Sequence, residues 1–107
     1  MSLGRLASQV QNGIALLDSE RGPEWVWSVD PDMLHMASYK RCVLGQLYGE
    51  YMVGSADLAL SDSALICHGF EIRGIFRDYA ALDRLWAYAI RRLREQRTPP
   101  RVSAVAS

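Results

Sequence analysis

The chain has 107 residues, of which 50% are hydrophobic, as is typical of one globular domain with a single core. Its 12 basic residues balance 12 acidic residues, so the overall charge favours neither nucleic acid nor anionic lipid. We expect two free, buried cysteines in a cytoplasmic protein, because the N-terminus lacks the pattern of a secretory signal. The apolar runs are far shorter than the roughly 20 residues that cross a bilayer, so no membrane contact is expected.

The first predicted element is an amphipathic helix over residues 2–18. Its apolar residues recur at spacings of three and four: Leu3, Leu6, Val10, Ile14 and Leu17. Gly13 weakens this helix by up to about 1 kcal/mol relative to alanine, so we expect packing to hold it. Pro23 then suits the first position of a short helical turn that carries Trp25 and Trp27, whose rings most often fill a core at such positions.

Two helices are predicted in the middle of the chain. Ser38 is the expected N-cap of a central helix over residues 39–51. Ser61 and Asp62 are expected to cap a short helix that stops at Gly69. The following segment, 70–76, fits either a short extended piece or a loop, and an extended piece would have no obvious strand partner.

The clearest predicted helix begins after Asp78, a suitable N-cap, and keeps apolar spacings of three and four from Tyr79 to Leu93. Its polar residues are expected to face water: Asp83, Arg84, Arg91, Arg94 and Glu95. Two prolines end it after Thr98. The elements together predict a mainly α protein, a compact bundle of about four to five helices over residues 1–97, followed by a disordered tail over residues 98–107.

Four residues have the types of a zinc site but not its spacing: His35, Cys42, Cys67 and His68. Cys67 and His68 are adjacent, so on a helix they point about 100 degrees apart. Adjacency alone also does not make the cysteine–histidine–carboxylate geometry of a nucleophilic site. We therefore expect no metal, no cofactor and no enzymatic activity, and we expect His68 to stabilise a helix C-terminus.

Two surfaces remain as candidate partner-binding sites, an aromatic segment with Trp25 and Trp27 and a basic segment with Arg91, Arg92 and Arg94. The first 83 residues hold 6 basic and 11 acidic side chains, whereas the remaining residues hold 6 arginines and one glutamate. Arginines near a helix C-terminus also complement the helix dipole, so a purely structural role for them stays open.

Several short motifs are spread over residues 13–90. They are residues 41–49 (Arg-Cys-Val-Leu-Gly-Gln-Leu-Tyr-Gly), 13–18 (Gly-Ile-Ala-Leu-Leu-Asp), 22–25 (Gly-Pro-Glu-Trp), 68–70 (His-Gly-Phe) and the helix with Tyr79, Leu82 and Trp86. In these motifs the chain resembles small uncharacterised proteins of actinobacteria and their bacteriophages. The resemblance carries no functional residues, and it implies a phage or prophage accessory protein that acts in the host cytoplasm.

Three hypotheses follow from the sequence. The leading one is a non-enzymatic interaction module that binds and modulates a host protein, because the helical domain is rich in aromatic residues and lacks catalytic groups. The alternative is a small nucleic-acid-binding regulator that uses the basic C-terminal arm. The third is an enzyme or metalloprotein built on Cys42, Cys67 and His68. The oligomeric state is left open.

Overall fold

The computed structural model describes residues 3–73 and 78–100. Its elements in chain order are α1 (Leu3–Arg21), the 3-10 helix η1 (Pro23–Trp27), α2 (Val43–Tyr48), α3 (Tyr51–Asp57), α4 (Asp62–Cys67) and α5 (Tyr79–Gln96). The residues described in these two ranges contain five α-helices and no strand, which confirms the predicted mainly α bundle. None of these helices combines the length and the apolar character that crossing a membrane requires.

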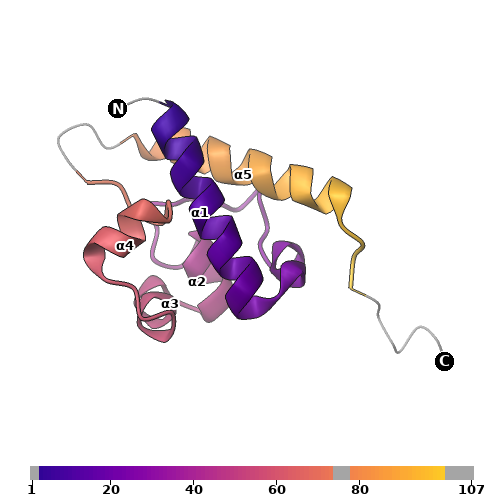
Figure 1. Ribbon diagram of the computed structural model, residues 1–107, viewed down its shortest axis with the longest axis horizontal. Helices are drawn as coiled ribbons and strands as arrows, with labels where there is room; N and C mark the ends of the chain where they lie inside the picture. Colours follow the sequence, from indigo (N-terminus) through magenta and orange to yellow (C-terminus); the bar gives the residue numbers. More distant parts are fainter. Residues whose placement is uncertain (1–2, 74–77, 101–107) are drawn as a thin grey trace.

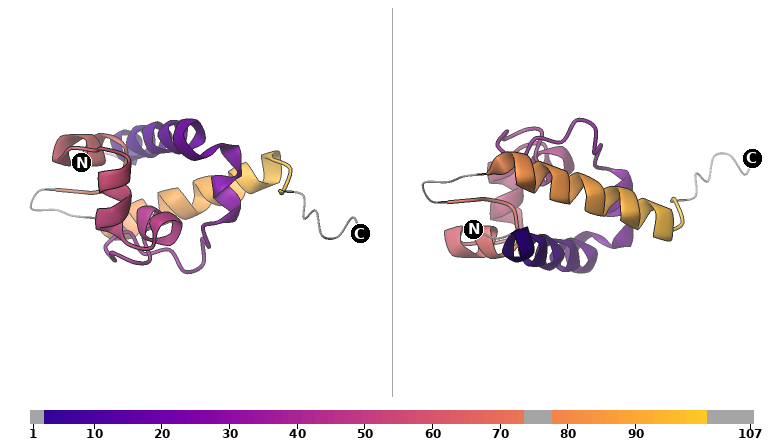
Figure 2. Two further views of the ribbon diagram at one scale, coloured as in Figure 1. Left: turned by 90° about the horizontal axis from the view of Figure 1, so that it is seen from below. Right: turned by 90° about the horizontal axis from the view of Figure 1, so that it is seen from above.

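The two long helices, α1 and α5, cross each other, and the short helices α2, α3 and α4 lie below α5 in the view of Figure 1. Viewed from above, α5 lies in front of α2, and α1 runs away from the viewer beside α4 (Figure 2, right). Both helices therefore have an inner side that packs on the core and an outer side that faces solvent.

Trp86 on α5 is at the centre of the core and is fully buried. Its ring stacks on Phe70, with centroids 5.6 Å apart, and meets Trp25 edge to face at 6.3 Å. The indole Nε1–H donates a hydrogen bond of 2.7 Å to the carbonyl of Gly69, so the one polar group of this side chain is satisfied. The apolar stripe of α5 thus packs as its spacing predicts.

Gly13 allows α1 to approach this centre closely. A Cβ atom at this position would lie 2.2 Å from the carbonyl oxygen of His68 and 2.9 Å from the ring of Trp86. The helix-weakening effect of glycine is therefore offset by the close contact of α1 with the end of α4 and with α5.

The prediction of one central helix over residues 39–51 is wrong. In a continuous helix the carbonyl of Arg41 would accept the N–H of residue 45, but here it accepts the N–H of His35 and the side-chain amide of Gln46. Helix α2 begins only after Cys42, whose thiol sulfur accepts the N–H of Gly45. It ends at Gly49, whose φ of 90° leaves the helical region, and α3 follows as a separate helix.

The cap predictions for α4 and α5 are confirmed. Ser61 accepts the N–H of Ala64 at 3.2 Å, and Asp78 accepts the N–H of Ala81 at 2.9 Å. Residues 70–73 lie in neither helix nor strand. The rest of the segment for which an extended piece was considered, 74–77, and most of the predicted tail, 101–107, lie outside the described residues.

Candidate functional site

Trp25 belongs to the core, so the prediction that it binds a partner is wrong. Only 2% of the residue is exposed, and its ring packs against Trp86. Its Nε1–H donates a hydrogen bond of 2.7 Å to a carboxylate oxygen of Asp18. Both the ring and its polar group are therefore used inside the protein.

Arg94 also points inward, contrary to the prediction that it faces water. Its guanidinium donates to the carbonyls of Val26 (2.9 Å) and Val29 (2.6 Å), at the end of η1 and just beyond it. The guanidinium carbon lies 5.1 Å from the ring centroid of Trp27, which is partly buried. The carbonyls at the end of a helix lack intrahelical donors, and Arg94 supplies them. Trp27 and Arg94 thus form a structural contact and not a free binding surface.

Arg97 continues the inward contacts one turn further along. Its two Nη groups donate to the two carboxylate oxygens of Asp18, each at 2.9 Å, and Nη1 also donates to the carbonyl of Pro23 at 2.8 Å. Asp18 therefore accepts hydrogen bonds from both Arg97 and Trp25. Through these contacts the three residues connect the ends of α1 and α5 to η1.

Arg91 and Arg92 remain on the outer side of α5, with 53% of each side chain exposed. Arg91 forms an ion pair with Asp32, and Arg92 forms one with Glu95 at 3.3 Å. Exposed ion pairs of this kind contribute little free energy, so either guanidinium can exchange its carboxylate for one on another molecule. Of the five predicted partner-binding residues, these two are accessible together.

Tyr88 is the most prominent side chain beside them, with 65% of the residue exposed. A groove of about 330 Å³ runs along one side of it, between α1 and α5, and a second hollow of about 270 Å³ lies on the other side. The groove is lined by residues that include Val10, Ile14, Leu85, Ala89, Arg92 and Leu93. The hollow is lined by residues that include Pro31, Leu34, Ala87 and Arg91. We call Tyr88, Arg91, Arg92 and the two depressions the Tyr88 surface.

A third concave region, which the sequence did not predict, has a volume of about 530 Å³. Its lining residues are Met36, Ala37, Tyr39, Tyr51, Phe70, Glu71, Ile72, Arg73 and Tyr79, and we call it the tyrosine groove. Tyr39 is 66% exposed and stacks on Tyr51, with centroids 5.8 Å apart. The region thus offers aromatic walls that are partly open to solvent.

Glu71 supplies the charged group of the tyrosine groove. Its carboxylate accepts the hydroxyl of Tyr51 at 2.5 Å and the Nε–H of Arg73 at 2.7 Å. Burial, with the adjacent Glu71 carboxylate, raises the pKa of the Tyr51 hydroxyl, so this hydroxyl stays protonated and remains a donor. The signal that points to this arrangement is alternation: Phe70 and Ile72 are buried, while Glu71 and Arg73 lie on the other side of the extended chain.

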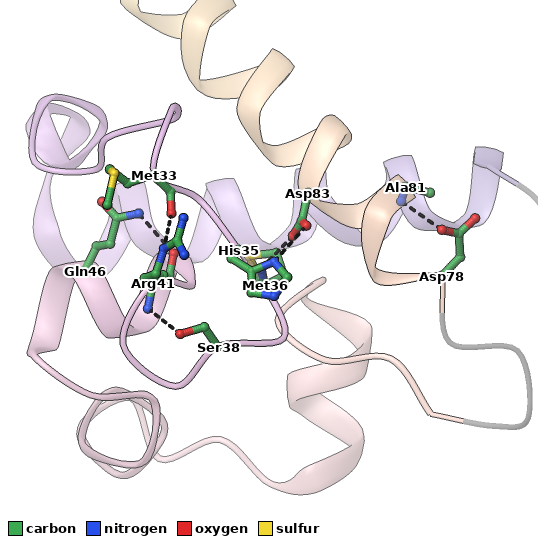
Figure 3. A network of polar contacts seen from close by, with 9 residues as sticks. All are labelled: Met33, His35, Met36, Ser38, Arg41, Gln46, Asp78, Ala81 and Asp83. Carbon is green, nitrogen blue, oxygen red and sulfur yellow. Dashed lines mark hydrogen bonds and ion pairs between the residues drawn. The ribbon is translucent and has the colours of Figure 1, made fainter.

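His35 and Asp83 form the one histidine–carboxylate pair in the described residues, with Nδ1 and Oδ2 3.4 Å apart. The same carboxylate accepts the backbone N–H of Met36 (Figure 3). Arg41 closes the loop by donating from Nε to the carbonyl of Met33 at 2.9 Å. Asp83 was expected to face water, but it binds this loop and so connects it to α5. These contacts stabilise the fold.

The cysteines and His68 do not come together as a site. Cys42 is buried, and burial raises the pKa of its thiol; Cys67 is exposed, so the expectation that both are buried is wrong for Cys67. His68 forms a hydrogen bond of 2.7 Å from Nδ1 to the carbonyl of Ala64, as predicted for a helix C-terminus. Within residues 3–73 and 78–100 no three His, Cys, Asp or Glu side chains are grouped to hold a metal ion.

Compared with models of protein families, with curated proteins and with solved structures, the chain matches none of them. The resemblance to small proteins of actinobacteria and their phages stays a prediction. The Tyr88 surface and the tyrosine groove are two features of the described residues that could contact another molecule.

Proposed function

We propose that this protein is a non-enzymatic interaction module that binds another protein through the Tyr88 surface. The observation that carries the proposal is the exposed ring of Tyr88, which lies between a groove with a mostly apolar lining and a hollow lined by apolar and charged residues, and beside two accessible arginines. Tyrosine and arginine are enriched among the residues that dominate binding energy at protein interfaces. The fold holds them on a long, well-packed helix, which limits the entropy lost on binding.

The shape of the groove favours a helical segment of the partner. It runs between two helices, and Ala7 and Ala89 among its lining residues leave room for a third helix to approach. An amphipathic helix that places apolar side chains at every third or fourth position in such a groove is a recurrent mode of recognition. The arginines at its edge would meet acidic or carbonyl groups on that helix.

A host protein is our proposed partner, with the host cytoplasm as the proposed location. This part of the proposal rests on the sequence resemblance to actinobacterial and phage proteins, and the phage or prophage origin rests on it as well.

The nucleic-acid alternative has less geometric support. Two of the arginines that would neutralise phosphates, Arg94 and Arg97, donate instead to backbone carbonyls and to Asp18. Arg91 and Arg92 are exposed, and each is paired with a carboxylate. The basic C-terminal segment is thus much less cationic on its described surface than its composition indicates.

The test compares proteins captured from an actinobacterial lysate by the wild type, Tyr88→Ala and Met52→Ala. Met52 is a matched control, since it is a large apolar residue on α3 that is 60% exposed and lies outside the Tyr88 surface. We expect a protein captured by the wild type and by Met52→Ala to be lost with Tyr88→Ala, while thermal unfolding of all three remains similar. Equal capture by Tyr88→Ala would refute the proposal. It would also be refuted if an excess of untagged wild-type protein displaced none of the proteins captured by the tagged wild type.

A further inference from the structure

We propose that the tyrosine groove is a second binding site, and that its ligand is a guanidinium or amidinium cation attached to a flat apolar body. The site is independent of the Tyr88 surface, since no residue lines both. The proposal rests on three features that lie together in the groove. They are the stacked rings of Tyr39 and Tyr51, the carboxylate of Glu71, and the guanidinium of Arg73, which already pairs with that carboxylate.

The walls of the groove suit a flat group. Its volume of about 530 Å³ is in the range of small-molecule sites. Tyr39 is two-thirds exposed, and its ring lies nearly parallel to that of Tyr51, with an interplanar angle of 22°. A planar cation placed against such a ring gains both stacking and attraction to the negative face of the aromatic system.

Glu71 gives the groove its preference for positive charge. Only 21% of its side chain is exposed, and the Tyr51 hydroxyl holds one carboxylate oxygen in place. A carboxylate offers about four lone-pair positions, and the contacts with Tyr51 and Arg73 use one on each oxygen. The carboxylate is therefore fixed in orientation and keeps acceptor positions for a planar donor.

Arg73 shows which chemistry this carboxylate accepts. Its guanidinium contacts Glu71 through Nε at 2.7 Å and Asp62 through Nη2 at 3.1 Å, while 53% of the side chain is exposed. An ion pair this exposed is weakly held, so an incoming cation can replace it. Arg73 thus acts as an internal competitor, and only a ligand that adds contacts with the tyrosine rings displaces it.

The described charges that line the groove are those of Glu71 and Arg73, which are paired with each other. A ligand that displaces Arg73 therefore meets the carboxylate of Glu71, which favours a cation over a phosphate or a carboxylate.

The test is calorimetric titration of the full chain with two cations, benzamidine and an arginine whose amino and carboxyl groups are both blocked. Benzamide, which has nearly the same shape as benzamidine, is the neutral control. We expect Arg73→Ala to bind benzamidine about two- to fivefold more tightly than the wild type, because an exposed ion pair that competes for Glu71 is removed. Glu71→Gln keeps an acceptor for Tyr51 and loses the charge, so it should weaken binding about tenfold or more. Tyr39→Ala should also weaken it, whereas Met52→Ala should not.

The proposal is overturned if folded Arg73→Ala binds neither cation, or if benzamide binds as well as benzamidine. It is also overturned if Glu71→Gln leaves the affinity unchanged. Arg73→Gln provides a second variant without the cation, in case Arg73→Ala unfolds. Tighter binding of blocked arginine than of benzamidine would identify the natural ligand as a side chain of another protein, and the reverse would identify it as a small molecule; both results support the site.

Discussion

Four arginines at the C-terminal end of α5, three on its last two turns and Arg97 at its C-cap, divide into two pairs with opposite roles. Arg94 and Arg97 bind groups inside the molecule, and the Arg97 side chain is 22% exposed. Arg91 and Arg92 are 53% exposed and bind surface carboxylates. A cluster of like charges in a sequence is therefore not necessarily one surface. The groups that lie next to each arginine decide whether its side chain points inward or into solvent.

The difference follows from the geometry of the helix. Arg91 and Arg94 are three residues apart and so lie on the same side of α5, and Arg97 follows as the C-cap residue in an extended conformation. Along this side the neighbours change from Asp32, in an exposed loop, to the carbonyls at the end of η1 and then to Asp18. The buried backbone carbonyls and the partly buried Asp18 require donors, whereas the exposed Asp32 is satisfied by water.

The largest expected effect is that of Asp18→Ala. The substitution leaves the indole N–H of Trp25 and the guanidinium of Arg97 without their acceptor, so we expect a loss of about 2–3 kcal/mol in the free energy of unfolding. Chemical denaturation measures it, with Glu20→Ala on the exposed side of α1 as the control. A loss similar to that of the control would show that the contacts of Arg97 with Asp18 stabilise the fold no more than exposed ion pairs do.

Arg94→Ala should have an intermediate effect of about 1–2 kcal/mol. Two backbone carbonyls lose their side-chain donor, and the contact with the ring of Trp27 is removed. Arg94→Lys should recover only part of the loss, because an ammonium group lacks the planar fork that reaches both carbonyls. Full recovery by lysine would mean that charge alone holds the end of η1.

Arg91→Ala and Arg92→Ala should have the smallest effect on stability, below about 0.5 kcal/mol each, because their ion pairs are exposed. Capture of a partner through the Tyr88 surface should nevertheless decrease in both variants. Thermal unfolding and the capture experiment, run on the same samples, separate the two effects. A large loss of stability in either variant would remove the distinction between the two pairs.

The elements that the sequence predicts correctly are those fixed by neighbours along the chain. Ser61 and Asp78 cap α4 and α5 through atoms only three residues away, and the apolar spacing of α5 continues without interruption. The division between α2 and α3 occurs at Gly49, whose φ is positive, and just beyond it the N–H of Tyr51 donates to the carbonyl of Tyr39, twelve residues back in the chain. Periodicity carries no information about such contacts, so a single helix was predicted.

The same limit applies to the functional surfaces. Arg94 and its acceptors Val26 and Val29 are more than 60 positions apart, so its inward direction could not be predicted from the helix pattern. The tyrosine groove gathers residues from four separate stretches of chain, and no local motif marks it. The exposure of Arg91 was predicted from the helix period, but the same period also placed Arg94 in water, so it did not distinguish the two residues.

The edge-to-face contact of Trp25 with Trp86 also has an optical consequence. Two indole rings whose centroids are 6.3 Å apart couple electronically, so near-ultraviolet circular dichroism should report directly on the packed core. The Tyr88 surface and the tyrosine groove are lined by tyrosines and contain no tryptophan. Tryptophan and tyrosine signals therefore separate unfolding from binding in a single sample, without any added label.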